Sequence, residues 1–348
     1  MARFGVTVSG LTNFINSGDC VMREITYVEA INEALIEELE RDESVFIIGE
    51  DISIGYGGGG VFGATRGLME KFGEERVIDS PLSESALAGC AVGAALVNYR
   101  PIVEIMFADF LTIASDQIVN NAAKMRWCLG GNVDIPIVYR TAYGGGVGAG
   151  LHHSQCFEGW FAGVPGLKVV VPSTPADAKG LLKSAVRDNH PVLFMEHKLL
   201  YKRISGPVPD GDYLVPIGKG DIKREGNDVT IVAMGAMVHR AIEAADLLEK
   251  EGIQTEVVDP RTLLPLDEEI ILKSVAKTGH AVIVHEAPVT GGFGGEIGAI
   301  LAEKGMDYLE SPIKRVGSVF CPVPSSPEME QYYLPNAEKI RRAVLEIL

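Results

Sequence analysis

Apolar residues follow two alternating patterns along most of the chain. The first helical pattern starts at a Thr26-x-x-Glu29 capping box, in which each side chain can satisfy the other residue's backbone N–H. Apolar residues then recur every three or four positions, at Val28, Ile31, Leu35 and Leu39. Short apolar runs, which predict buried strands, follow at Val45–Ile48, Ile135–Tyr139, Val169–Val171 and Val192–Met195. Strands that alternate with helices indicate a parallel sheet covered on both faces.

The alternation stops at Gly206–Asp212, a segment rich in Pro, Gly and Asp, and then restarts. The second series predicts strands at Val229–Ala233, Glu256–Val258 and Ala281–His285, and helices at Val238–Lys250 and Asp267–Thr278. We therefore predict an α/β protein with two doubly wound parallel-sheet domains. The predicted parts are a disordered extension (1–21), a first domain (22–205), a linker (206–219) and a second domain (220–348).

Length and composition agree with this division. The chain has 348 residues, of which 47% are apolar and 22% charged, as in an ordinary globular protein of about two domains. The net charge of −16 disfavours binding to nucleic acid or to an anionic membrane surface. The longest apolar stretch, Ala86–Tyr99, is too short to span a bilayer, and the N-terminus shows no signal-peptide pattern.

The cysteines point to a reducing compartment. There are five, an odd number without metal-ligand spacing, at Cys20, Cys90, Cys128, Cys156 and Cys321. Free thiols of this kind are typical of intracellular proteins, so we predict a cytoplasmic location.

Glycine-rich loops are the first candidates for chemistry. They lie at Gly57–Gly60, Gly144–Gly146 and Gly291–Gly295, and the last follows a predicted strand and precedes a helical pattern. Its spacing does not produce G-x-G-x-x-G, so flexible turns compete with dinucleotide binding as an explanation. The chain also lacks the serine-hydrolase elbow G-x-S-x-G and the phosphate-binding loop G-x-x-x-x-G-K-[ST].

Three further segments carry titratable or aromatic side chains. Glu84 begins a helix after Pro81, where it either complements the helix dipole or does chemistry. Adjacent His152 and His153 follow a glycine-rich loop, and proton transfer suits such a histidine better than metal binding because no second ligand has suitable spacing. Phe110 ends a strand-to-helix connection, where core packing and ring stacking remain alternatives.

Several motifs together make the chain recognisable. From Met22 onward it resembles the beta subunit of the thiamine-diphosphate-dependent decarboxylating component of 2-oxo acid dehydrogenase complexes. That group acts on pyruvate, acetoin or branched-chain 2-oxo acids and has transketolase-like domains, one of which binds the cofactor's pyrimidine. The motifs occur in the family's order: Ile48–Asp51, Pro81–Glu84, Arg100–Glu104, His153–Gln155, Pro165–Lys168, Asp177–Leu181 and Glu286–Pro288.

The resemblance implies roles for individual residues. Glu84 matches the glutamate that hydrogen-bonds the aminopyrimidine ring, and Phe110 matches the aromatic residue that stacks on it. Leu82 and Met106 match its apolar and main-chain contacts. His153 matches a histidine that serves proton transfer while the acyl group passes to a lipoyl arm. The resemblance also implies a monovalent cation, K⁺, held largely by main-chain oxygens at Ile137, Ala185, Asp188 and His190.

One family motif is absent. Thiamine enzymes hold Mg²⁺ and the diphosphate through Gly-Asp-Gly followed about thirty residues later by Asn-Asn, whereas this chain has only Asp210-Gly-Asp212 with no such sequel. The resemblance therefore implies a separate alpha subunit that binds the diphosphate and Mg²⁺, an alpha2-beta2 assembly, and a lipoyl-bearing acyltransferase partner.

The expected function is oxidative decarboxylation of a 2-oxo acid, with pyruvate favoured, or cleavage of acetoin, with acyl transfer to the lipoyl group. The segments Gly218–Gly226 and Pro312–Arg315 resemble acetoin and bacterial pyruvate members. The segment Glu286–Phe293 resembles branched-chain members, so that substrate class remains an alternative. A non-catalytic docking subunit is the rival from another functional class.

Overall fold

The computed structural model describes residues 22–54 and 58–348. The predicted extension and Gly57 of the first glycine loop lie outside the described residues. By their contacts, the described residues of 22–143 and of Trp160–Ile217 form one compact unit, here called the N-terminal unit. Gly144–Gly159 and Gly218–Leu348 form a second, the C-terminal unit. The segment Gly144–Gly159 thus belongs by contact to the C-terminal unit, although it directly follows a strand of the N-terminal unit.

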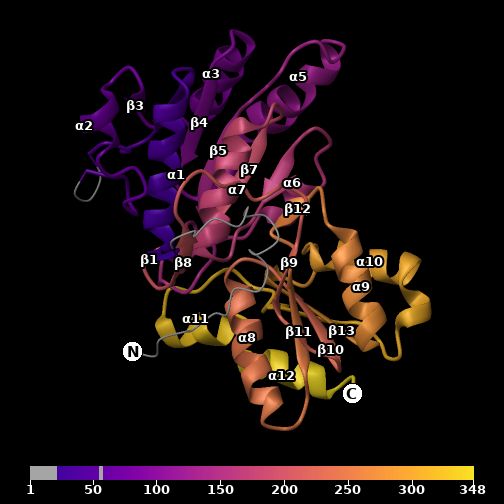
Figure 1. Ribbon diagram of the computed structural model, residues 1–348. Coiled ribbons are helices and arrows are strands. Elements are labelled where there is room, and N and C mark those ends of the chain that lie inside the picture. The colour runs from indigo at the N-terminus through magenta and orange to yellow at the C-terminus, as the bar shows by residue number, and fades with distance from the viewer. Residues whose placement is uncertain (1–21, 55–57) are drawn as a thin grey trace. The chain divides into compact units, whose positions relative to one another are not determined.

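The N-terminal unit is built on a parallel sheet with the strand order β3-β2-β4-β5-β7-β6 (Figure 1). Its central strands are buried on both faces, which is why their sequences are nearly continuous apolar runs. The bounds are Val45–Gly49 (β2), Val77–Asp79 (β3), Arg100–Ile105 (β4), Val138–Tyr143 (β5), Lys168–Val170 (β6) and Val192–His197 (β7). The parallel sheet of the predicted fold is confirmed.

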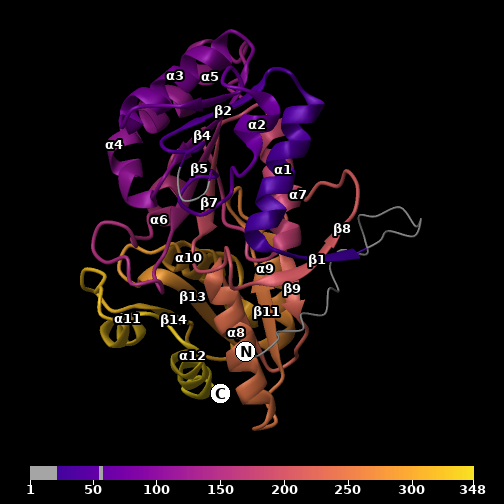
Figure 2. The ribbon, with the colours of Figure 1, turned by 90° about the vertical axis from the view of Figure 1, so that its left-hand side faces the viewer.

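Helices cover both faces of this sheet (Figure 2). Helices α1 and α7 pack against each other on one face, and α3, α4 and α5 lie on the other. A single π-helical turn, Asp116–Ala122, connects α4 to α5. The helix bounds are Tyr27–Arg41 (α1), Leu68–Phe72 (α2), Glu84–Leu96 (α3), Leu111–Ser115 (α4), Ala123–Cys128 (α5), Glu158–Ala162 (α6) and Pro175–Arg187 (α7).

The N-terminus of α1 confirms the predicted capping box. The Glu29 backbone N–H donates to the Thr26 hydroxyl at 3.3 Å, and the Thr26 backbone N–H donates to the Glu29 carboxylate at 2.8 Å. Further along, α1 meets α7 through ion pairs that bring fully buried Lys179 to Glu33 at 3.0 Å and to Glu37 at 2.6 Å. These ion pairs allow the aliphatic part of the Lys179 side chain to be buried at the apolar interface between the two helices.

The predicted linker contains a strand. Residues Ser205–Pro209 form β8, which pairs antiparallel with β1, Met22–Thr26. The prolines of this segment led to the expectation of a linker, but a two-stranded ribbon consists only of edge strands, where a missing N–H donor is tolerated.

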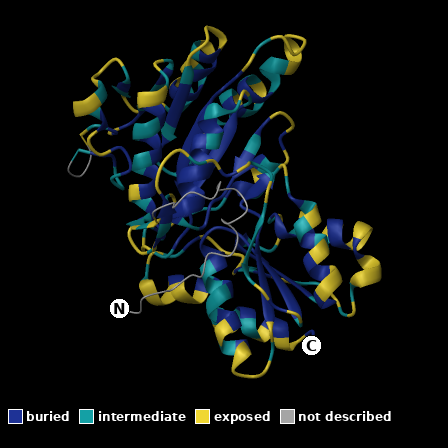
Figure 3. Cartoon of the chain, viewed as in Figure 1, coloured by how far each residue is buried: buried dark blue, intermediate teal, exposed yellow. Residues whose placement is uncertain are grey.

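The C-terminal unit contains a five-stranded sheet in the order β14-β13-β10-β11-β9. Strand β9 is antiparallel to β11 at one edge, and the remaining pairs are parallel. Its bounds are Asp221–Arg224 (β9), Val229–Ala233 (β10), Thr255–Asp259 (β11), Ala281–Pro288 (β13) and Lys314–Ser318 (β14), and a short strand, β12, covers Thr262–Leu264. In Figure 3 the central strands of both units are buried, so each unit has its own core.

Helices also flank both faces of this second sheet (Figure 1). Helices α8 and α12 pack together on one side, and α9 and α10 lie on the other. The bounds are Ala236–Glu249 (α8), Glu268–Thr278 (α9), Gly294–Lys304 (α10), Pro327–Tyr333 (α11) and Ala337–Leu345 (α12). Between residues 22 and 348, leaving out 55–57, no helix is long and apolar enough to cross a membrane.

Candidate active site

The candidate cofactor residues follow the carboxyl ends of three neighbouring strands. Glu50 comes directly after β2, Leu82 and Glu84 come shortly after β3, and Met106 comes directly after β4. Because β3, β2 and β4 are adjacent and parallel, these segments meet at the same edge of the sheet. Ligands of open parallel sheets bind at that edge. The sheet topology therefore assembles residues that are far apart in the sequence.

Glu84 is the first residue of α3, as expected, and it has an acidic neighbour. The Ser83 backbone N–H at the start of the helix donates to Glu50 Oε1 at 2.9 Å. Glu50 is 4% exposed, and its second oxygen, Oε2, is buried without a hydrogen-bond partner. Burial raises the pKa of Glu50; the Ser83 N–H opposes this shift, and the negative charge of Glu84 adds to it. The site therefore holds two neighbouring carboxyl groups.

Sequence reasoning assigned no role to Glu50. Glu50 lies inside the motif Ile48–Asp51, but an acidic residue directly after a strand can be there for many structural or functional reasons. The signal that distinguishes it is a contact with the backbone of Ser83, which is 33 positions away.

Apolar side chains also follow strands β3 and β4. Leu82 is 79% exposed. Phe110 is half-buried and lies edge-on to Phe107, with 5.8 Å between the ring centroids. Phe107 in turn contacts Phe62 at 5.7 Å. Phe110 therefore packs against another aromatic ring and is only partly buried.

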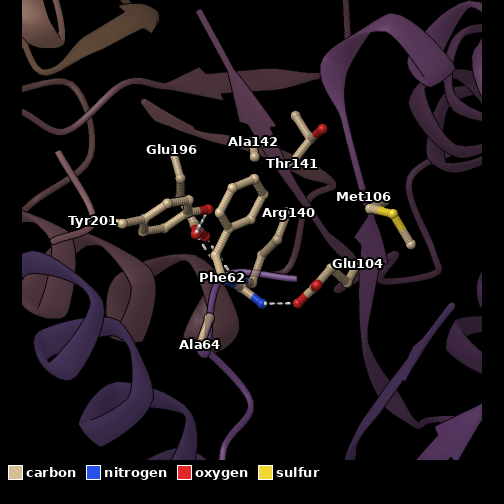
Figure 4. A pocket seen from close by; sticks show the side chains of 9 residues that line it. All are labelled: Phe62, Ala64, Glu104, Met106, Arg140, Thr141, Ala142, Glu196 and Tyr201. Atoms are coloured by element: carbon tan, nitrogen blue, oxygen red, sulfur yellow. Dashed lines mark hydrogen bonds and ion pairs between the residues drawn. The ribbon is translucent and has the colours of Figure 1, made fainter. Parts of the chain in front are cut away.

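A buried ionic cluster fixes the next strands at the same edge (Figure 4). The guanidinium of Arg140 donates to Glu104 at 2.8 Å and twice to Glu196, at 2.7 and 2.8 Å. The Tyr201 hydroxyl also donates to Glu196, at 2.7 Å. Burial raises the pKa of Glu104, and the positive charge of Arg140 opposes this shift. These four side chains tie strands β4, β5 and β7 to the segment that follows β7.

The cluster lines a small cavity with room for about one water molecule. Met106, the expected main-chain contact of the pyrimidine, lies on its wall opposite Tyr201 in Figure 4. The lining residues are Phe62, Ala64, Glu104, Met106, Arg140, Thr141, Ala142, Glu196 and Tyr201. The cavity is too small for a cofactor.

His153 lies in the C-terminal unit, in the loop Gly144–Gly159. It is half-buried, whereas its neighbour His152 is exposed. No group of three or more His, Cys, Asp or Glu residues within the described part of the chain could hold a metal ion. The proton-transfer role expected for His153 stays a prediction.

Comparisons with known proteins identify both units. Residues 23–203 match the family model "Transketolase, pyrimidine binding domain", and residues 218–340 match "Transketolase, C-terminal domain". The chain is 50% identical to the 2-oxoisovalerate dehydrogenase subunit beta of Bacillus subtilis over 94% of this chain and 99% of that protein. The chain belongs to the family of 2-oxo acid dehydrogenase E1 beta subunits. This confirms the family and the fold expected from the motifs.

Other members of the E1 beta family are similar to nearly the same extent. The acetoin:2,6-dichlorophenolindophenol oxidoreductase subunit beta of Bacillus subtilis is 47% identical over 94% of this chain and 98% of that protein. The pyruvate dehydrogenase E1 subunit beta of the same organism is 44% identical over 94% and 99%. A solved structure titled "Split gene transketolase, inactive beta4 tetramer" matches with a TM-score of 0.74 and 27% identity, over 92% of this chain and 97% of that one.

The residues at the sheet edge fit thiamine diphosphate, the cofactor on which this transketolase-like family depends. An aminopyrimidine is a flat ring that needs apolar surfaces on its faces and a carboxyl group at its edge. The exposed Leu82 side chain and the half-buried ring of Phe110 offer apolar surface, and Glu84 offers the carboxyl group.

The residues expected to hold K⁺ lie in the N-terminal unit and already have partners. The Asp188 carboxylate pairs with Lys168, and its main-chain oxygen accepts from Arg100 at 3.0 Å. Burial tends to raise the pKa of Asp188, but Lys168 and the His190 N–H lower it overall. A cation at Ile137, Ala185, Asp188 and His190 would thus depend on the remaining lone pairs of main-chain oxygens, and the site stays a prediction.

The glycine loop Gly291–Gly295 is explained by packing. A Cβ atom on Gly292 would lie 2.3 Å from the imidazole of His285, and one on Gly294 would lie 2.6 Å from it. His285 is fully buried, and burial lowers its pKa to about 4. Glycine is required there because the backbone passes directly over a buried neutral ring. Of the two sequence-based alternatives, the structure therefore favours a turn over a dinucleotide site.

Proposed function

We propose that this chain is the catalytic beta subunit of the decarboxylating component of a 2-oxo acid dehydrogenase complex. One observation carries the proposal: Glu84 begins α3, the exposed Leu82 lies two residues before it, and the half-buried ring of Phe110 follows β4. All three come after strands whose carboxyl ends meet at the ligand-binding edge of the sheet. Side chains of these three types, in a domain that matches the transketolase pyrimidine-binding domain, support binding of the pyrimidine end of thiamine diphosphate.

Each residue has a defined task in this proposal. Glu84 holds a proton at the edge of the aminopyrimidine ring, while Leu82 and Phe110 cover its faces and the backbone at Met106 completes its contacts. When bound, the cofactor supplies the electron sink that decarboxylation of a 2-oxo acid requires. His153 moves a proton during transfer of the acyl group to a lipoyl arm, because a histidine can carry a proton in either direction near neutral pH.

The proposal requires partner proteins. An alpha subunit would hold the diphosphate and Mg²⁺ and would form an alpha2-beta2 assembly with this chain. A lipoyl-bearing acyltransferase would take the acyl group. The proposed location is the cytoplasm, which is consistent with Cys90, Cys128, Cys156 and Cys321 lying outside any disulfide.

Pyruvate is the proposed substrate, with acetoin next. The segments Gly218–Gly226 and Pro312–Arg315 support this preference. A branched-chain 2-oxo acid is the alternative substrate class, favoured by 50% identity to a 2-oxoisovalerate dehydrogenase subunit against 44% to a pyruvate dehydrogenase subunit.

The test is co-expression with the product of the neighbouring alpha-subunit gene. Release of CO₂ from pyruvate and from 2-oxoisovalerate, and cleavage of acetoin, would be measured side by side. Glu84→Gln should lower turnover of the preferred substrate by about 100-fold or more, since it removes the positioned acid. Glu74→Gln, which changes an exposed acid on the same unit, is the matched control.

Full activity of Glu84→Gln would refute the role of Glu84. Full activity of a chain that carries both Glu84→Ala and His153→Ala would instead support the rival, a docking subunit without catalytic residues. Binding of thiamine diphosphate by titration calorimetry gives a readout that does not depend on turnover, and Glu84→Gln should weaken it.

A further inference from the structure

The glycine-rich loop before His153 has an unusual backbone. Four alternate residues adopt positive φ, with values of 86° at Gly144, 89° at Gly146, 72° at Gly148 and 73° at Gly150. Residues with a Cβ atom rarely adopt this conformation, so glycine is required at each position. Alternation of left-handed and ordinary residues turns successive backbone N–H groups toward one side, which makes a concave site for anions.

The anions that occupy this concave site belong to the same unit of the same chain. The Gly145 N–H donates to Glu286 Oε1 at 2.5 Å. The Gly146 and Gly148 N–H groups donate to the two oxygens of Glu330, at 2.8 and 3.0 Å. Glu286 is 4% exposed and Glu330 is 5% exposed, so both carboxylates are withdrawn from solvent. Hydrogen bonds to ionised carboxylates are about twice as strong as neutral ones.

Glu286 also contacts the chain on the far side of His153. The Cys156 thiol lies 3.5 Å from the same Oε1 atom that accepts from Gly145. Glu286 therefore holds two points of the loop, one before His153 and one after it. At Gly150 a Cβ atom would lie 2.5 Å from the hydroxyl oxygen of Ser325, so the loop also rests closely on the segment that leads into α11.

We propose that Glu286 and Glu330 are positioning residues that hold the loop Gly144–Gly150, and through it His153, in the place from which the histidine moves its proton. The inference rests on the proposed function of His153. It assigns the glycine loop to binding the chain's own carboxylates, so that the loop is not a site for a nucleotide phosphate.

Hydrogen exchange of the full chain tests the contact itself. Glu330→Gln keeps one acceptor oxygen but loses the charge, and Glu330→Ala removes both acceptors. We expect exchange of the amides at 144–150 to rise about 10- to 100-fold in Glu330→Ala, with a smaller rise in Glu330→Gln. Glu328→Gln is the matched control, because Glu328 is an exposed acid on the same helix. Unchanged exchange in Glu330→Ala would overturn the proposal.

Kinetics of the chain with its alpha subunit test the link to His153. Turnover would be measured with a lipoyl domain as acceptor and with the dye 2,6-dichlorophenolindophenol, which bypasses the lipoyl arm. Glu330→Gln should lower the lipoyl-dependent rate about 10-fold and leave the dye-dependent rate within about twofold. The double variant Glu330→Gln/His153→Ala should be no slower than His153→Ala alone, because both changes act on one step.

The two proposals fail in different ways. Full lipoyl-dependent activity of His153→Ala would refute the proposed function of His153, and the positioning role with it. A loss in His153→Ala combined with wild-type rates in Glu330→Gln, or with fully additive losses in the double variant, would refute the positioning role alone.

Discussion

Glu158 should make the stability of this protein fall as pH rises. Its side chain is 3% exposed, and its Oε2 atom has no hydrogen-bond partner. Burial raises the pKa of Glu158 to about 7; its own backbone N–H opposes this shift, and the negative charge of Glu286 adds to it. The carboxyl group is therefore largely protonated in the folded protein under conditions in which the unfolded chain ionises it.

The size of the effect follows from the two pKa values. The pKa of Glu158 is about 7 in the folded protein, against a reference of 4.5 for the unfolded chain. At 1.36 kcal/mol per pH unit, this difference corresponds to a contribution of about 3 kcal/mol to the free energy of unfolding. The folded protein binds this proton more tightly than the unfolded chain does. The stabilisation from protonated Glu158 is therefore complete below pH 4.5 and is lost as pH rises through about 7. Between pH 5 and pH 8 this group alone should lower the free energy of unfolding by roughly 2 to 3 kcal/mol.

The variant Glu158→Gln tests this reasoning because an amide of the same shape does not titrate. At pH 8 it should be more stable than the wild type by about 3 kcal/mol, and at pH 5 the two should agree within about 1 kcal/mol. Urea unfolding followed by circular dichroism across this pH range measures the difference. Glu296→Gln, an exposed acid on α10, is the control and should leave the pH dependence unchanged. Equal pH dependence in Glu158→Gln and wild type would refute the argument.

Four further predictions concern stability. Arg140→Met leaves the carboxylates of Glu104 and Glu196 without their cation and should cost about 3 to 5 kcal/mol in urea unfolding at pH 7. The imidazole of His285 should titrate near pH 4 by NMR, so its contribution to stability is present above pH 6.5 and lost as pH falls through about 4; a midpoint near 6.5 would contradict its burial. Gly294→Ala should destabilise by roughly 1 to 3 kcal/mol, whereas Gly298→Ala, with no neighbour closer than 3.9 Å, should be neutral or stabilising in thermal unfolding. Thr26→Ala should lower the free energy of unfolding by about 1 kcal/mol through loss of the cap, and an unchanged melting temperature would contradict the capping role.

Local patterns predicted the elements of this fold well. The capping box at Thr26 set the start of α1, and Val229–Ala233 was predicted with the bounds that β10 has. The strand expected at Ile135–Tyr139 instead runs from Val138 to Tyr143. Pro136 lacks a backbone N–H and so cannot donate to a sheet ladder, which moves the start of pairing to Val138. Strand β8 was missed because its prolines resemble those of a linker.

The sequence predicted some residues of the candidate site but not the partners that surround them. The family motifs pointed to Glu84, His153, Leu82, Met106 and Phe110. The roles of these five residues remain predictions. No motif indicated that Glu50 stands beside Glu84, or that Arg140 joins Glu104 to Glu196. Such partners come from separate strands, and their pairing depends on strand order, which no local pattern contains.

The sequence by itself determined the α/β class, most helices and strands, the family, and the absence of a diphosphate-binding motif, because these depend on residue type and spacing along the chain. The tertiary structure decided which strand ends are neighbours, and so which side chains share a site. The tertiary structure also decided what the backbone of each glycine-rich loop contacts. Gly145, Gly146 and Gly148 bind buried carboxylates from residues more than 130 positions away, and Gly292 and Gly294 cover a buried imidazole. A glycine has no side chain to reveal its contact in the sequence, so only the folded chain shows what its backbone approaches.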